Sequence, residues 1–184
     1  MTPPPGRQSL PDEAVIAAQI GRRPRGLHAI AKRCPCGLPA VIETAPRLDD
    51  GTPFPTLYYL TCPKAVAAVS RLEADGVMRE MTERLARDAS LSEGYSAAHR
   101  DYLARRERVT RESGVAPLPP GTQSAGGMPE RVKCLHALVA HELAAPGVNP
   151  FGADVLSEIG AWWAGGPCVP AATGEPAVTG EDAR

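Results

Sequence analysis

The chain has 184 residues, of which 43% are apolar and only 4% aromatic, and its formal net charge is −1. This length suits one domain, and the near-zero net charge argues against a general nucleic-acid binder. No stretch approaches the roughly 20 apolar residues of a membrane helix, and the N-terminus lacks the apolar core of a signal peptide. We therefore expect a cytoplasmic protein with no membrane partner, and leave a protein partner open.

The first third of the chain predicts one helix and then strands. Residues 1–10 are rich in proline, and we expect them to be disordered. A helix follows from Pro11, a residue that suits the first helical turn. Residues 27–34 form a short candidate strand. Two stronger strands, at 38–48 and 54–62, predict a hairpin, with a turn signal at Asp49-Asp50-Gly51-Thr52 between them.

The remainder predicts helices. One runs from Pro63 to about residue 88, with Gly76 able to divide it, and a second covers residues 92–112. A long loop over about 112–129 precedes a helix at 130–145 and a last short helix before Trp162. We thus expect a single α+β domain over 11–165, in which a small antiparallel sheet built on the hairpin at 39–62 packs against several helices. Residues 166–184, with Cys168, are expected to be a disordered tail.

The cysteines supply the main candidate site. Five is an odd number in a chain that is not cysteine-dense, so a secreted disulfide scaffold is disfavoured. Thiolate and imidazole ligands typically bind zinc or an iron–sulfur cluster. The predicted ligands come from three distant segments; they are Cys34, Cys62, Cys134 and His136, with Cys36 and His141 ranked behind them.

Helix geometry sets that ranking. Cys36 follows Cys34 after one residue, closer than the two to four residues of a zinc knuckle. His141 is seven residues beyond Cys134, a rise of about 10 Å on a helix, which is too far for one ion. His136 is two residues from Cys134 and would point away from it on a helix, so the two can share an ion only if Cys134 precedes the helix.

Two other interpretations of the cysteines stay open. Free cysteine is among the most buried residue types, so each one taken alone could simply fill the core. Alternatively, Cys62 could be the nucleophile of a thiol-dependent enzyme. It lies where a strand ends and a helix begins, and a helix N-terminus lowers a thiol pKa. His136 or His28 would then be the base.

A basic run offers a third candidate function. Residues 22–33 contain no acid, and with Lys133 they could form a non-catalytic site for an anion or a nucleic acid. The competing interpretation is a solvated loop balanced by acids elsewhere, which the near-zero net charge favours. The candidate anion-binding residues are Arg22, Arg23, Arg25, Arg33 and Lys133.

Two long stretches resemble a known family. They are RCPCGLPAVIETAPRLDDGTPFPTLYYLTCPKAVAAVSRLEADGVM and GGMPERVKCLHALVAHELAAPGVNPFG. Together they are similar to the bacterial domain-of-unknown-function 501 family, best known in actinobacteria, and the resemblance spans about residues 12–163. It implies a cytoplasmic bacterial domain with no assigned activity. The matching positions include Cys34, Thr61-Cys62-Pro63, Lys133-Cys134-Leu135-His136 and Asn149-Pro150.

Overall fold

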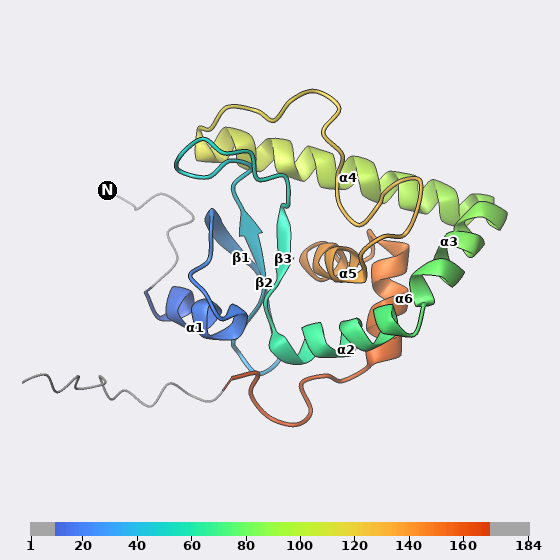
Figure 1. Ribbon diagram of the computed structural model, residues 1–184, viewed down its shortest axis with the longest axis horizontal. Coiled ribbons are helices and arrows are strands. Elements are labelled where there is room, and N and C mark those ends of the chain that lie inside the picture. Colours follow the sequence, from blue (N-terminus) through green and yellow to red (C-terminus); the bar gives the residue numbers. More distant parts are fainter. Residues whose placement is uncertain (1–9, 170–184) are drawn as a thin grey trace, which may run out of the picture.

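A computed structural model of the chain describes residues 10–169. This part contains six helices and one three-stranded antiparallel sheet, which confirms the predicted α+β class (Figure 1). The tails predicted at 1–10 and 166–184 fall largely on residues 1–9 and 170–184, outside the described part. The elements are α1 (Leu10–Ile20), β1 (Leu27–Arg33), β2 (Pro39–Thr44), β3 (Tyr58–Leu60), α2 (Pro63–Ala74), α3 (Val77–Arg87), α4 (Ala89–Ser113), α5 (Leu135–Ala144) and α6 (Pro150–Ile159).

The sheet has the order β1-β2-β3, with β2 in the centre and buried along its whole length. Side chains alternate between the two faces of a strand, so neighbours on β2 serve different sides. Val41 belongs to the main core cluster, whereas Ile42, next to it, does not. Figure 1 shows α1 on one side of the sheet and α5 on the other. Both faces of β2 are therefore covered by helices.

The predicted hairpin is present, but its second strand is short. β2 and β3 pair antiparallel, with Val41 opposite Leu60 and Glu43 opposite Tyr58. Of the residues 54–62 that were predicted to form a strand, only the three from Tyr58 to Leu60 do so. Pro53 and Pro55 have no backbone N–H to give to a ladder, and proline is confined to strand edges for this reason.

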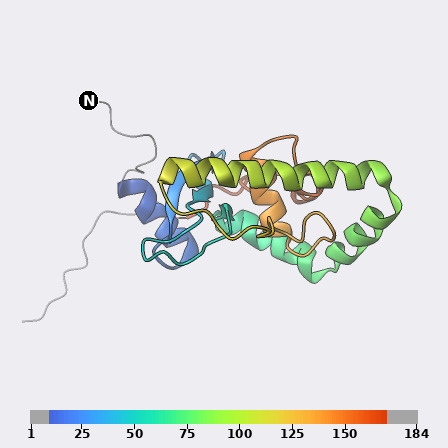
Figure 2. The same ribbon diagram turned by 90° about the horizontal axis from the view of Figure 1, so that it is seen from above.

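Helix boundaries follow the glycine signals. Gly76 has φ 84° and separates α2 from α3, as its position predicted. Gly114 has φ 66° and ends α4, the long helix that runs along one side of the described fold (Figure 2). Within residues 10–169, none of the helices combines the length and apolar composition that crossing a bilayer requires.

The loop predicted over 112–129 is packed against α4 by a buried arginine. The guanidinium of Arg106 donates to the carbonyl oxygens of Thr122 and Gln123, each at 2.7 Å, and to that of Pro55 at 3.1 Å. The side chain thus joins α4, the loop and the segment before β3. The Tyr102 ring, with its centroid 6.0 Å from the guanidinium carbon, is a further partner of this charge, and burial lowers the pKa of Arg106.

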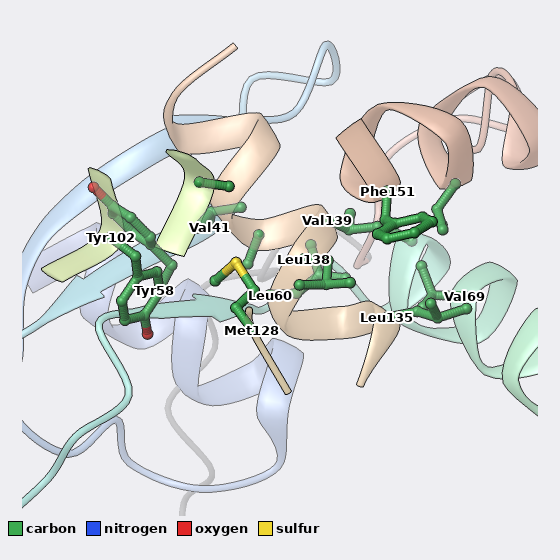
Figure 3. Packing of buried hydrophobic residues seen from close by; sticks show 14 of the residues in the cluster. Val41, Tyr58, Leu60, Val69, Tyr102, Met128, Leu135, Leu138, Val139 and Phe151 are labelled. Carbon is green, nitrogen blue, oxygen red and sulfur yellow. The ribbon is translucent and has the colours of Figure 1, made fainter. Parts of the chain in front are cut away.

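Helix α5 is the centre of the core. Leu135, Leu138 and Val139 are fully buried, and Figure 3 shows them between the Tyr58–Tyr102 pair on one side and Phe151 on the other. A helix with apolar residues on all faces is typical of such a buried position. It begins at Leu135, five residues later than predicted.

Two polar side chains of α5 are buried with it. The carboxylate of Glu142 accepts backbone N–H bonds from the turn after the helix, from Val148 at 3.0 Å and Asn149 at 2.7 Å. His141 is fully buried, and its Nε2 lies 3.0 Å from the Asp101 carboxylate. Buried polar groups are tolerated when they are bonded in this way.

Helices α5 and α6 approach so closely that a glycine is needed between them. A Cβ atom on Gly152 would lie 2.4 Å from the carbonyl oxygen of Leu138 and 2.6 Å from Cβ of Glu142. The first of these neighbours is backbone, which cannot move without shifting α5. Gly94 on α4 offers a contrast, because a Cβ there would meet only Pro150 Cγ, at 3.8 Å.

We expect Gly152→Ala to lower the free energy of unfolding by about 1–3 kcal/mol, because the added methyl group forces α5 and α6 apart. The matched control, Gly94→Ala, should raise it by about 0.5–1 kcal/mol, since alanine favours a helix interior and has room. Urea unfolding followed by circular dichroism measures both. Equal stability of the two variants would contradict the close approach.

Candidate metal centres

Four of the five cysteines come together at one end of α2. Cys34 and Cys36 lie in the turn between β1 and β2, and Cys62 is the N-cap of α2, with Pro63 in its first turn. Cys168 arrives from the segment after α6. Two backbone hydrogen bonds close this turn, each 2.8 Å long. The N–H of Cys34 donates to the carbonyl oxygen of Leu38, and the carbonyl oxygen of Cys34 accepts from the N–H of Gly37. Its folding presents both thiols on the same side.

The sulfur atoms are close enough for one ion. Sγ atoms of Cys34, Cys62 and Cys168 all lie within 4.8 Å of one another. Cys168 Sγ is 3.1 Å from Cys62 Sγ and 3.1 Å from Cys36 Sγ. The three mutually close residues are buried, with exposed fractions of 3%, 0% and 9%. All are free thiols. Cys34, Cys36, Cys62 and Cys168 are called the four-cysteine group below.

Backbone amides are directed at two of these sulfurs. Burial raises the pKa of Cys36, but the amides of Leu38 and Cys168 and the thiols around it outweigh burial and lower its pKa to about 7. Burial also raises the pKa of Cys34, against the effect of the Cys36 amide, and here burial prevails. Burial and the contact with Cys62 raise the pKa of Cys168. Amide donors of this kind favour the thiolate form that binds metals.

The position of Cys168 differs from the sequence prediction, which placed it in a disordered tail. It is buried in the core, and the residues just before it are held by Lys64 of α2, whose Nζ donates to the Gly166 carbonyl at 2.8 Å. A signal in the sequence does distinguish the group. Each of its cysteines is next to a proline, whereas Cys134, flanked by Lys133 and Leu135, is not.

The structure divides the predicted ligand set between two places. Cys134 and His136 do not join Cys34 and Cys62; they form a second group with Glu73 of α2, in which the three ligand atoms lie within 4.8 Å of one another. This second group draws its residues from two segments of the chain, α2 and the start of α5, whereas the predicted site drew them from three. We call Glu73, Cys134 and His136 the Glu–Cys–His group.

The geometric condition set for Cys134 and His136 is met. Cys134 is the N-cap of α5, with extended backbone at φ −148° and ψ 108°. It therefore precedes the helix, and its side chain is free of the helical periodicity that would turn it away from His136. The contact with Cys134 raises the pKa of His136, burial opposes this, and Glu73 adds to the rise, so that the pKa is about 9.

His141, ranked behind the other ligands in sequence, lies in neither group. It is stacked on Tyr58, with ring centroids 5.9 Å apart, and meets the edge of Tyr102. Its Nδ1 lies 3.3 Å from Asn149 Nδ2, which can only donate, so the proton belongs on Nε2 facing Asp101. Burial lowers the pKa of His141, in keeping with a neutral packing residue.

Cys62 has the predicted place at the start of a helix but not the surroundings of a nucleophile. It is fully buried, and its sulfur contacts Cys168. The polar contacts of the two candidate bases are with other residues than Cys62. His136 contacts Glu73 and Ser70, and His28 contacts Glu112 and Ser113. A nucleophile must be reached by its substrate, and complete burial of the thiol works against this.

Two of the five Lys and Arg residues of the basic run are paired with acids. Arg33 binds Asp12 at 2.7 Å, and Arg23 binds Glu13 at 2.9 Å. The guanidinium of Arg22 lies over the Tyr59 ring. This is the arrangement of a solvated, balanced surface.

Two hollows lie apart from the cysteines. One, of about 1200 Å³, is lined by Arg23, Arg25 and Arg47 but also by Glu13, Asp49 and Asp50. The other, of about 420 Å³, lies between α4 and the loop that follows it. Neither is lined by a cysteine. The mixed charge of the larger one does not favour an anion.

The chain was compared with known proteins. A family model described as "Protein of unknown function (DUF501)" matches residues 30–157. Searches of curated proteins and of solved structures returned no match. The matched region contains the whole Glu–Cys–His group and three members of the four-cysteine group, and it ends before Cys168. Since the match covers more than half of the chain, this protein belongs to the DUF501 family of proteins of unknown function.

Proposed function

We propose that this protein binds one zinc ion through the four-cysteine group, in a structural site that joins the sheet, α2 and the segment after α6. The observation that carries the proposal is the meeting of three buried sulfurs within 4.8 Å of one another, with a fourth sulfur 3.1 Å from Cys168. Four cysteine ligands without an open position are typical of structural zinc. This replaces the predicted site that included Cys134 and His136.

The spacing of the sulfurs favours a single ion over an iron–sulfur cluster. Four thiolates at roughly 2.3 Å from zinc, in tetrahedral geometry, lie about 3.8 Å from one another. Cys168 Sγ lies 3.1 Å from the sulfurs of Cys36 and Cys62, and the sulfurs of Cys34, Cys62 and Cys168 lie within 4.8 Å of one another, so these separations bracket that value. A cluster places several iron and sulfide atoms between its cysteines and needs them further apart. Small movements of the side chains would suffice for zinc.

A metal ion here also removes the electrostatic cost of the site. Thiolates so close together repel one another, and burial further disfavours their charge, which is why the pKa values of Cys34 and Cys168 are raised. A divalent cation inverts this balance, because a coordinating thiol is deprotonated outright. The amides directed at Cys34 and Cys36 then support the charged ligands.

A metal ion in this site would cross-link distant parts of the chain. Cys36 and Cys168 are 132 residues apart, so an ion that holds both closes most of the described fold into one loop. Cross-links across long loops restrict the unfolded chain most strongly. By analogy with a disulfide, a loop of this length corresponds to about 4–5 kcal/mol. The reducing bacterial cytoplasm that the family resemblance implies would keep the thiols available, and we include that location in the proposal.

We expect Cys168→Ser to lose one equivalent of zinc and to lower the melting temperature by about 10–20 °C. This decrease follows from losing the free energy of the metal cross-link in a chain of this size. Zinc content is measured by mass spectrometry of the metal after purification with a reductant, which is needed because sulfurs 3.1 Å apart would otherwise oxidise. Melting is followed by circular dichroism.

A pair of shortened chains serves as the control. A chain that ends at Gly165 lacks Cys168 and should behave like Cys168→Ser, whereas one that ends at Val169 should keep its zinc and its melting temperature. A chain that ends at Gly165 with unchanged zinc and unchanged melting would rule out the four-cysteine site. The comparison isolates the four residues 166–169.

We also expect zinc affinity to fall as the pH is lowered. At pH 7 the raised pKa values keep Cys34 and Cys168 protonated, and the pKa of Cys36 is about 7, so zinc must displace protons. Each proton displaced lowers the affinity roughly tenfold per pH unit below the thiol pKa. Competition with a coloured chelator at pH 6, 7 and 8 gives the slope. An affinity that does not change over this range would exclude thiolate ligation.

A further inference from the structure

We propose that the Glu–Cys–His group is a second divalent-metal site, of the zinc class, with three protein ligands and a coordination position left to solvent. It is independent of the four-cysteine group, because it shares no residue with it, and two of its three ligands are His136 of α5 and Cys134, the N-cap of that helix. The ligand atoms of Glu73, Cys134 and His136 lie within 4.8 Å of one another. A thiolate, an imidazole and a carboxylate together suit zinc better than magnesium or calcium.

The histidine is oriented as a ligand through Nδ1. Its Nε2 lies 3.2 Å from the carbonyl oxygen of Val66 and 3.2 Å from the hydroxyl of Ser70. A carbonyl can only accept, so Nε2 carries a proton, and a bound ion would displace the proton on Nδ1 that faces Glu73. Metal-bound histidines almost always donate their other N–H to such a partner. The supporting contact is thus already in place on α2.

The carboxylate approaches the same ring nitrogen. Glu73 Oε1 lies 3.1 Å from His136 Nδ1 and accepts the backbone N–H of Leu135 at 2.7 Å. Both contacts use Oε1, so Oε2 takes part in neither. Glu73 therefore caps the N-terminus of α5 and still has a second oxygen to offer a cation. The cap alone explains neither the histidine nor the cysteine beside it.

An acid–base arrangement around a reactive thiol fits less well. In that arrangement the carboxylate binds one ring nitrogen and the nucleophile faces the other. Here the carboxylate is on Nδ1, and the opposite nitrogen of His136 is occupied by Val66 and Ser70. The sulfur of Cys134 lies within 4.8 Å of the ligand atoms of both Glu73 and His136. Convergence of three donors is what a metal ion requires.

The exposure of the group sets the expected coordination. The side chains of Glu73 and His136 are each 25% exposed, and Cys134 is half-buried, unlike the enclosed four-cysteine group. Three protein ligands at a position reached by water are typical of zinc sites that keep an open, water-filled position, whereas structural sites are closed. The two groups therefore differ in ligand number and in access.

Cobalt titration of the full metal-free chain, under argon with a reductant, tests the second site. The absorption of thiolate-bound cobalt reports how many sulfurs bind each ion. We expect two equivalents in the wild type, one with strong absorption from four thiolates and one with weak absorption from a single thiolate. Cys134→Ser and Glu73→Gln should each lose only the weak equivalent. Serine is a better N-cap than cysteine, so Cys134→Ser is expected to fold.

Glu80→Gln is the matched control for Glu73→Gln, because it removes an exposed carboxylate of α3 that belongs to neither group, and it should keep both equivalents. If Cys134→Ser takes up as much cobalt as the wild type, the second site is overturned whatever happens at the first. Loss of the strong equivalent in Cys168→Ser, with the weak one retained, supports both sites. Absence of the strong equivalent from the wild type, with a weak one that Cys134→Ser removes, rejects only the four-cysteine site.

Discussion

The described fold depends on the burial of α5 together with its two polar residues. A helix at the centre of a core can carry charge only where every polar group finds a partner, because an unpaired one would cost several kcal/mol. The Glu142 carboxylate meets this condition by binding the amides of the turn into α6, and His141 by bonding to Asp101 and Asn149. Those bonds also fix how α6 and α4 lie against α5, and Gly152 then allows the helices to touch.

Helix α2 connects the packing to the candidate chemistry. Cys62 caps its N-terminus, and Val66 and Glu73 further along it contact His136. From Cys62 to Glu73 the helix rises about 16 Å, so the two proposed sites stand at a fixed separation on one rigid element. One cysteine of each group, Cys62 and Cys134, precedes a helix as its N-cap rather than lying within it. Extended backbone at an N-cap frees a side chain from helical periodicity, which lets residues of distant segments converge.

Much of the fold was predictable from local pattern, and the site was predictable only in part. Gly76 divides two helices as predicted, and the condition that Cys134 must precede its helix came from geometry alone. The shortness of β3 was not foreseen, because the apolar and aromatic residues within 54–62 gave a stronger signal than Pro55, which precedes β3. Which cysteines meet is a tertiary property: Cys62 and Cys168 are 106 residues apart, with no periodic pattern between them. Proline neighbours were the one local clue, and composition pointed instead to a tail.

Because Cys168 follows the other three cysteines by more than 100 residues, the ligands of the four-cysteine site are synthesised at different times. Cys34, Cys36 and Cys62 leave the ribosome first, and the 106 residues from Cys62 to Cys168 take about 5–20 s to synthesise. During that interval the nascent chain carries three thiols and lacks the fourth. The sheet and α2 can form early, but the proposed ion can be enclosed by all four cysteines only after Cys168 has left the ribosome. A chain released too early would be recognisable by its unclosed thiols.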